Sequence, residues 1–194
     1  MFGVLEGLLG KECLSYIDDI LIFGRNELEC HARQRRVFSR LRKANLKNKP
    51  SKCKFFRREV TFLNQKVSAA GVRPDREKVQ VMREWPVPGT VRQMQSFLGL
   101  VKYFARYIKD YAEVAAPLYE KTRAGSGSIR ITLDVVELKH FEPLKNKLAE
   151  LPLLSHPLLD EPFTLQTDAS TTAIGSVVLQ QQPDGLERPI AYIF

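Results

Sequence analysis

The 194 residues carry 30 Lys and Arg against 22 Asp and Glu, a formal net charge of +8, and 44% of them are hydrophobic. This composition excludes an intrinsically disordered chain, and the length allows one large domain or two small ones. No run approaches the roughly 18 consecutive apolar residues of a membrane span, and the N-terminal residues lack the pattern of a secretory signal. We therefore expect an intracellular protein that has no membrane partner.

Charge is unevenly distributed along the chain. Residues 134–194 carry 4 Lys and Arg against 9 Asp and Glu, a balance of −5, whereas residues 1–133 carry 26 against 13, a balance of +13. Within the basic part, residues 31–58 hold twelve Lys and Arg and no carboxylate. Such a segment attracts a polyanion, and nucleic acid is the natural candidate. A solvated helix face followed by a Lys-rich loop explains the same composition.

The first elements that the sequence predicts are a β-hairpin and a helix. Two apolar runs surround an Asp-Asp pair in CLSYIDDILIFG, residues 13–24, which is the pattern of a tight hairpin with the carboxylates at its tip. Asn26 is placed to cap a helix, and Glu29 is in position for a reciprocal bond. Residues 46–72 follow as a basic loop and a short strand pair that closes at Gly71.

A group of helices is predicted next. One helix should begin at Asp75 and end near the two prolines of WPVP at 85–88. Thr90 and Gln93 form a capping-box pattern that opens a second helix, and a further helical stretch carries several aromatic side chains. We expect Trp85 to anchor the core of these helices rather than to stack on a nucleic-acid base.

The AGSGS segment at 124–128 is predicted to be a linker, because its Gly and Ser residues favour no single conformation. It coincides with the change in charge sign. Beyond it we expect a helix over 134–150 that is interrupted or kinked near Pro143. Strands are predicted after this helix, at 163–170, at 173–181 and, beyond a turn at 183–185, in the terminal RPIAYIF.

Asp18 and Asp19 at the predicted hairpin tip are candidate metal ligands. Two adjacent carboxylates repel each other unless a cation lies between them, and a pair of Mg²⁺ ions about 4 Å apart commonly serves nucleotidyl transfer. Aspartate also favours turns for local hydrogen-bonding reasons, so the dipeptide alone leaves both interpretations open.

The sequence around this pair resembles the Y-x-D-D hairpin of reverse transcriptases. Further blocks follow in the order typical of long-terminal-repeat retrotransposons of the gypsy type, and together they cover nearly the whole chain. They are L-K-x-K-P-S-K-C-x-F-F at 46–56, G-V-R-P-D-x-E-K-V at 71–79, W-P-x-P at 85–88, S-F-L-G-L-V-x-Y-F-x-R-Y-I at 96–108, A-x-P-L at 115–118 and T-D-A-S at 167–170.

The resemblance implies roles for the residues of the hairpin. Asp18 would be a catalytic metal ligand with Asp19 as its partner, and the metal would be Mg²⁺. Tyr16 and Ile17 would lie near the primer terminus and the incoming nucleotide. On pattern alone, Tyr16 is equally well explained as a half-buried aromatic residue of a strand.

The resemblance also implies contacts with nucleic acid. Residues 61–65 correspond to the primer-grip hairpin of the family, so Phe62, Leu63, Asn64 and Gln65 would contact the primer. The family's usual run there is F-L-G-H, and Asn64 and Gln65 replace its glycine and histidine. The thumb and connection helices would add phosphate contacts, as would the basic loop; the candidates are Lys102, Arg106, Lys52 and Lys54. Solvated surfaces explain these cations as well.

Asp168 forms a separate candidate site. Its place near the end of a predicted strand, in T-D-A-S, resembles the first catalytic aspartate of RNase H, whose enzymes use several carboxylates and two metal ions. A strand-end aspartate in a turn is the simpler explanation without the resemblance. The match is partial, because SGSIRITLD replaces the aromatic-rich segment that precedes the following helix in the family.

The resemblance therefore predicts an α+β fold in four parts. Residues 1–72 would be part of the polymerase palm, 73–123 thumb and connection helices, 124–133 a linker, and 134–194 the truncated start of an RNase H-like sheet.

The implied function is RNA-directed DNA polymerisation within a retrotransposon polyprotein, in the cytoplasm or in a virus-like particle. The partners would be an RNA/DNA template-primer duplex, deoxynucleotides and the rest of the polyprotein. A further metal-binding aspartate and the fingers lie upstream of this region in the family, so we expect the isolated chain to be inactive. The alternative is a non-catalytic nucleic-acid-binding remnant of a retroelement.

Overall fold

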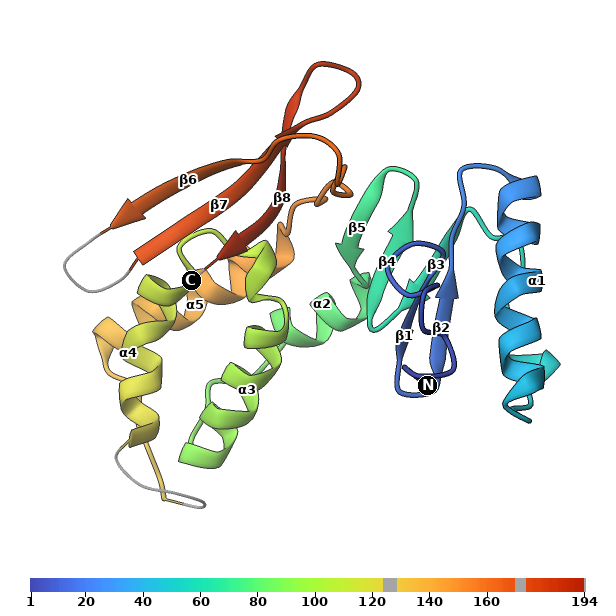
Figure 1. The fold of residues 1–194 in the computed structure, drawn as a ribbon. Coiled ribbons are helices and arrows are strands. Elements are labelled where there is room, and N and C mark those ends of the chain that lie inside the picture. The colour runs from blue at the N-terminus through green and yellow to red at the C-terminus, as the bar shows by residue number, and fades with distance from the viewer. Residues whose placement is uncertain (124–128, 170–173, 194) are drawn as a thin grey trace. The chain divides into compact units, whose positions relative to one another are not determined.

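The computed structural model describes residues 1–123, 129–169 and 174–193, and the chain divides into two compact units, Met1–Leu63 and Asn64–Phe194. Both units combine helices with antiparallel strands (Figure 1). The predicted α+β class is therefore confirmed. The division falls at 63/64 rather than at the expected palm boundary of 72, and the second unit contains the helices as well as the C-terminal sheet. None of the described helices is long and apolar enough to cross a membrane.

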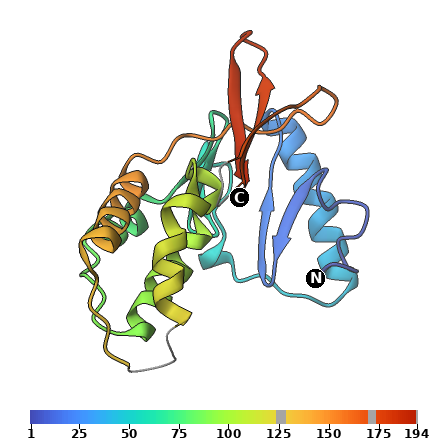
Figure 2. The same cartoon turned by 90° about the vertical axis from the view of Figure 1, so that its left-hand side faces the viewer.

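The first unit is built from a hairpin and one long helix. Strand β1 (Cys13–Tyr16) pairs antiparallel with β2 (Asp19–Ile22), as the two apolar runs predicted. Helix α1 (Glu27–Lys43) lies alongside the hairpin in both views (Figures 1 and 2). A small core joins them. Its buried members are Leu5, Leu8, Cys13, Val37 and Leu41.

Helix α1 begins where the sequence predicted. The Asn26 side chain accepts a hydrogen bond from the Glu29 amide at 2.9 Å. The expected reciprocal bond, in which the Glu29 carboxylate accepts from the Asn26 amide, does not form. That carboxylate accepts instead from the backbone amide of Arg25, at 2.7 Å. The remaining elements of this unit are the short 3₁₀ helix η1 (Pro50–Lys52) and strand β3 (Glu59–Phe62).

The second unit opens with a hairpin of which the sequence predicted only one strand. Strand β4 (Gln65–Ser68) pairs with β5 (Gly71–Pro74), which begins at Gly71, where the expected strand pair was to close. Helix α2 (Arg76–Arg83) follows directly; the sequence predicted a helix that begins at Asp75, and the structure shows that this residue caps it through its side chain. Strand β5 also exchanges two backbone hydrogen bonds with Leu154, through Val72, at 2.8 and 2.9 Å.

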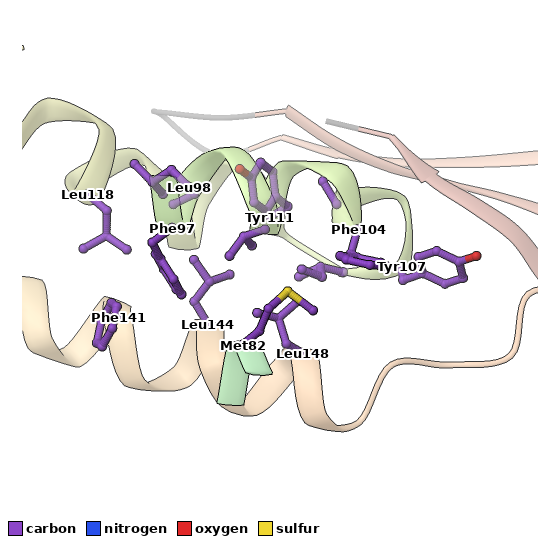
Figure 3. Close-up of a cluster of buried hydrophobic side chains, with 14 of the residues drawn as sticks. Met82, Phe97, Leu98, Phe104, Tyr107, Tyr111, Leu118, Phe141, Leu144 and Leu148 are labelled. Carbon is purple, nitrogen blue, oxygen red and sulfur yellow. The ribbon is translucent and has the colours of Figure 1, made fainter. Parts of the chain in front are cut away.

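The helices of this unit enclose a large aromatic and aliphatic core (Figure 3). Phe97 lies at its centre, with its ring 4.7 Å from that of Phe141 and 6.1 Å from that of Trp85. Trp85 is therefore a core residue, as expected. The core is contributed by α2, α3 (Val91–Tyr103), the 3₁₀ helix η2 (Ala105–Tyr107), α4 (Tyr111–Arg123) and α5 (Val135–Ala149).

Two expectations about the middle of the chain need revision. The first five residues of the expected 124–133 linker lie outside the described residues, but 129–131 pair with 89–91: the Val91 amide donates to Ile129 and the Ile131 amide donates to Gly89, both at 3.0 Å. Helix α5 is continuous through Pro143 rather than interrupted there. Pro143 is exposed, so the backbone acceptor that it leaves unpaired can be solvated.

Three antiparallel strands form the C-terminal sheet, in the order β6 (Thr164–Ala169), β7 (Ile174–Gln181) and β8 (Glu187–Ile193). Figure 1 shows α4 and α5 on one side of this sheet. Tyr192 packs into the helical core from β8, and the Ser155 amide donates to Pro189 on the same strand at 2.9 Å. The sheet and the helices therefore form one packed body.

Candidate active site and nucleic-acid contacts

The two faces of the β1–β2 hairpin have different environments. Cys13 pairs with Ile22 on the face that contributes to the core with α1. Tyr16 and Asp19 are opposite each other in the register and both are exposed, Tyr16 by 55%. Because side chains alternate along a strand, the hairpin buries one face and presents the other. The structure thus brings Tyr16, Ile17, Asp18 and Asp19 together at one exposed tip.

The turn at this tip holds a backbone conformation that its sequence does not favour. Ile17 has φ of 51°, in the left-handed region, and its side chain is 71% exposed. A β-branched residue avoids this region, and strain of this kind costs on the order of 1–3 kcal/mol. Neither burial nor a glycine relieves it here. Strained residues of this type cluster at functional sites, so the turn geometry supports a functional tip.

The carboxylates of the first unit fall into two groups. Both carboxylate oxygens of Glu12 accept from the single Nε of Arg36, at 3.0 and 2.8 Å. Glu29 Oε1 forms an ion pair with Arg33 Nη2 at 2.7 Å. Hydrogen bonds from Arg25, aided by the charges of Arg25 and Arg33, lower the pKa of Glu29.

Asp18 and Asp19 are exposed and form no ion pair with any residue that the structure describes. Their oxygens are open to a cation from solvent. Had the fold buried this pair or tied it to lysines, metal binding at the tip would have been excluded.

The predicted basic contacts Lys52 and Lys54 lie on the exposed loop that follows α1. Two aromatic side chains stand beside them: Phe55 is 45% exposed and Phe56 is 55% exposed. The ring of Phe56 stacks on His31 at 6.4 Å, and Phe55 meets Phe38 edge-on at 6.3 Å. This surface combines cations with exposed rings, which suits a nucleic-acid strand.

The predicted primer-contact residues surround a two-residue turn between β3 and β4. Leu63 and Asn64 both have positive φ, 50° and 56°, which is the conformation of a tight hairpin turn. The tight turn therefore forms although Asn64 replaces the family's usual glycine. Asn64 is exposed at the apex of the turn, and Phe62, which precedes it, is half-buried. The Asn64 carbonyl accepts a hydrogen bond from the Asp75 amide at 3.0 Å.

Gln65 makes a contact that sequence reasoning missed. Its Oε1 accepts a hydrogen bond from the hydroxyl of Tyr107 at 3.0 Å. Tyr107 is 1% exposed, and burial raises its pKa to about 12. A tyrosine spaced with the apolar residues Phe104 and Ile108 is the sequence signal that could have indicated such a partner, because a buried hydroxyl needs one.

Lys102 and Arg106, the predicted phosphate contacts of the helices, are both exposed. Arg106 also has internal neighbours: its guanidinium lies 5.7 Å from the centre of the Tyr107 ring and donates to the Ile190 carbonyl at 3.5 Å. Lys102 stands on the last turn of α3. Both cations remain accessible to an anion.

Asp168 lies on the edge strand β6 and is exposed. Its register partner on β7 is Gly175, and a Cβ at Gly175 would lie 3.8 Å from Oδ1 of Asp110. Asp110 follows η2 and has φ of 60°. Asp168 belongs to the second compact unit, whereas Asp18 and Asp19 belong to the first.

Solved structures with this fold are known. The chain is similar to foamy viral protease-reverse transcriptase in complex with double-stranded DNA, with a TM-score of 0.81 and 22% identity over 99% of this chain and 33% of that one. The same viral protein in complex with an RNA/DNA hybrid gives a TM-score of 0.80 at 22% identity, over 98% of this chain and 25% of that one.

Two family descriptions match successive parts of the chain. Residues 1–67 match "Reverse transcriptase (RNA-dependent DNA polymerase)", and residues 134–193 match "RNase H-like domain found in reverse transcriptase". The first region contains the hairpin with Asp18 and Asp19, and the second contains Asp168. The order of the two matches is the order that the sequence blocks predicted.

Curated relatives extend over nearly the whole chain. The Pol polyprotein of the Drosophila melanogaster transposon opus is 39% identical over 98% of this chain, and those of gypsy and 297 are 36% and 34% identical over 98% and 100%. The chain spans only about a fifth of their length, 20%, 19% and 18% respectively. The chain is therefore similar to the Pol polyproteins of gypsy-type retrotransposons, and it carries reverse transcriptase sequence at 1–67 followed by RNase H-like sequence at 134–193.

Proposed function

We propose that this chain supplies the metal-binding hairpin and part of the primer-binding surface of an RNA-directed DNA polymerase. The observation that carries the proposal is the hairpin tip, where Asp18 and Asp19 stand exposed and unpaired beside a strained Ile17. Nucleotidyl transfer requires carboxylates that are free to bind cations next to the primer end. Glu12 and Glu29, which are bound to arginines, could not serve this purpose.

The donor set at the tip suits Mg²⁺. Carboxylate oxygens are the hard ligands that this ion prefers, and two of them leave room for water and substrate phosphates. When bound, the metal would supply charge neutralisation for the attacking and leaving oxygens. Asp18 and Asp19 would hold it, while Tyr16 on the same exposed face would border the nucleotide and primer terminus.

We infer that an RNA/DNA template-primer duplex is the partner. The net charge of +13 over residues 1–133 favours a polyanion, and the exposed Lys52, Lys54, Lys102 and Arg106 offer phosphate contacts. Deoxynucleotides would be the second substrate. Asp168 would contribute a carboxylate to cleavage of the RNA strand by the RNase H-like part, in the context of the longer polyprotein.

Primer extension in a chimera tests the polymerase role. Residues 1–194 replace the matching segment of the opus polyprotein, and the product is assayed with an RNA template, a DNA primer and Mg²⁺. Asp18→Asn and Asp19→Asn should each reduce extension to background. Asp160→Asn, which removes another exposed aspartate, is the matched control and should extend normally. Full extension by the Asp18→Asn chimera would overturn the assignment.

The isolated 194-residue chain should behave differently from the chimera. No group of three or more His, Cys, Asp or Glu side chains within the described ranges could hold a metal ion. We expect the chain alone to bind a duplex but to extend it negligibly, because two-metal sites use more ligands than the two carboxylates of the tip.

A second candidate function is a nucleic-acid-binding protein without catalysis. The exposed basic and aromatic surface around Lys52, Lys54 and Phe56 favours it, since such a surface binds nucleic acid whether or not the hairpin is active. The chimera separates the two functions. A chimera that binds the duplex with strong salt dependence, yet fails to extend the primer while opus itself does, supports binding alone.

A further inference from the structure

The turn at Leu63 and Asn64 is held by bonds to elements distant in the sequence. The Asn64 carbonyl accepts from the Asp75 amide at the start of α2, at 3.0 Å. The next residue, Gln65, accepts from the Tyr107 hydroxyl in η2, also at 3.0 Å. Asn64 at the apex and Gln65 after it are thus each bonded to a different helical element of the second unit.

Tyr107 is itself immobilised. Its ring is 1% exposed, and Figure 3 shows its hydroxyl pointing out of the apolar cluster while the ring packs into it. The Arg106 guanidinium lies 5.7 Å from the ring centre and donates to Ile190 on β8. Because the Tyr107 ring is buried and covered by Arg106, its hydroxyl has little freedom to move. The hydrogen bond between this hydroxyl and Gln65 Oε1 therefore fixes the position of Gln65 rather than that of Tyr107.

The hydroxyl remains a donor under ordinary conditions, because burial keeps it protonated well above neutral pH. Gln65 offers one acceptor and two N–H donors, and its acceptor is occupied by Tyr107. Within the described part of the chain, no residue accepts a hydrogen bond from Gln65 Nε2. The amide is therefore oriented with its donors away from Tyr107.

We propose that Tyr107 is a positioning residue for the primer-binding turn and that it acts through Gln65. The ligand class is the phosphodiester backbone of the primer strand near its 3′ end. Gln65 stands where the family usually has histidine, and the Tyr107 hydroxyl gives this amide the fixed orientation that a polar contact requires. The inference rests on the proposed function, since it assigns a role within the same nucleic-acid surface.

A merely structural hydrogen bond is the alternative, and the chain contains a matched example. The hydroxyls of Tyr111 and Tyr119 lie 2.9 Å apart in the same helical unit, and Tyr111 is 2% exposed. Tyr111→Phe removes a buried tyrosine hydroxyl just as Tyr107→Phe does. The hydroxyl partner of Tyr111 is Tyr119 on α4, however, and not a residue of the turn. The two variants should lose similar stability, which removes folding as an explanation for any difference in binding.

The experiment measures fluorescence anisotropy of the 194-residue chain with two labelled duplexes, one with a recessed 3′ end and one blunt. The unmodified chain should prefer the recessed end. Tyr107→Phe and Gln65→Ala should each weaken binding of the recessed duplex about 3- to 10-fold, which corresponds to the loss of one net hydrogen bond, and leave the blunt duplex unchanged. The double variant should bind no more weakly than Gln65→Ala alone.

Three outcomes would overturn the proposal. If Tyr107→Phe keeps the preference for the recessed end, or weakens both duplexes equally, Tyr107 has no positioning role although the proposed function stands. If the effects of Tyr107→Phe and Gln65→Ala add, the two residues act independently. If the unmodified chain has no preference for the recessed end, the primer-binding function itself fails, and the positioning role fails with it.

Discussion

The two compact units solve the problem of stability in different ways. The first buries five side chains beside α1 and relies on surface pairs such as Arg36 with Glu12. The second encloses a cluster of seventeen buried side chains, among them the packed rings of Phe97 and Phe141. The unit with the exposed carboxylates Asp18 and Asp19 thus has the smaller core, and the unit with the larger core holds Tyr107 and Asp75, which bind the residues of the turn at Asn64 and Gln65.

The largest expected effect is on the larger core. Phe97→Ala should lower the free energy of unfolding of the second unit by about 3–5 kcal/mol, because its ring contacts both Phe141 and Trp85. Urea denaturation followed by tryptophan fluorescence reports on this unit, which contains Trp85. The control Leu41→Ala, in the small core of the first unit, should leave that tryptophan transition in place. If Leu41→Ala lowers the free energy of unfolding seen by tryptophan fluorescence as much as Phe97→Ala does, the two cores are not independent.

Gly71→Ala should be the next most damaging change. A Cβ at this position would lie 2.2 Å from the Leu154 carbonyl oxygen, and the φ of 137° is one that side-chain-bearing residues rarely adopt. We expect a loss of about 3 kcal/mol in the second unit, measured by thermal unfolding. Gly185→Ala has φ of 81° but no atom within 4 Å, so it should cost less and serves to separate the steric clash from the backbone strain.

Alkaline pH should affect the second unit through Tyr107. Burial raises the pKa of this hydroxyl to about 12, from 10 in the unfolded chain. A group whose folded pKa is raised contributes stability below its unfolded pKa and loses it as the pH rises to the folded value. Stability of the second unit should therefore fall as the pH rises from 10 towards 12, and Tyr107→Phe should make this fall less steep, while Tyr111, whose pKa is also raised by burial, accounts for the part that remains. An unchanged slope in the variant would contradict the assignment to Tyr107.

Acid pH should affect the first unit by a smaller amount through Glu29. Its pKa is lowered by hydrogen bonds from Arg25 and by the nearby arginine charges, so its contribution is present above the unfolded pKa near 4.5 and is lost as the pH falls through the lower folded value. Glu29→Gln should remove part of the acid dependence of helix content, followed by circular dichroism. Glu27→Gln, in the same first turn of α1, is the control and should change it less.

Local patterns allowed much of the fold to be predicted, and distant contacts explain what was missed. Asn26 and Thr90 were identified as helix caps because capping depends on residues three or four apart. Strand β5 was missed; it pairs with the neighbouring β4, but its other partner, Leu154, lies about eighty residues later. Likewise, residues 129–131 of the expected linker pair with Gly89 and Val91, which no composition rule could indicate.

The candidate site shows the same division. Apolar runs on both sides were enough to place Asp18 and Asp19 at a turn, and the structure places them there. The left-handed Ile17 could not be predicted, because its side chain argues against that conformation. The bond between Tyr107 and Gln65 joins residues 42 positions apart, so only the folded chain reveals it.

The backbone hydrogen bonds between Leu154 and Val72 also bear on where the chain can be divided. The region recognised as RNase H-like begins at 134, yet Leu144 and Leu148 of α5 share a core with Met82 and Phe97, and Leu154 is stitched to β5. The region that matches the RNase H-like family and the compact unit that contains it therefore begin at different residues, 134 and 64. A fragment that begins at residue 134 would carry Leu144 and Leu148 without Met82 and Phe97 and should expose apolar surface, whereas a fragment that begins at Asn64 would keep this core whole.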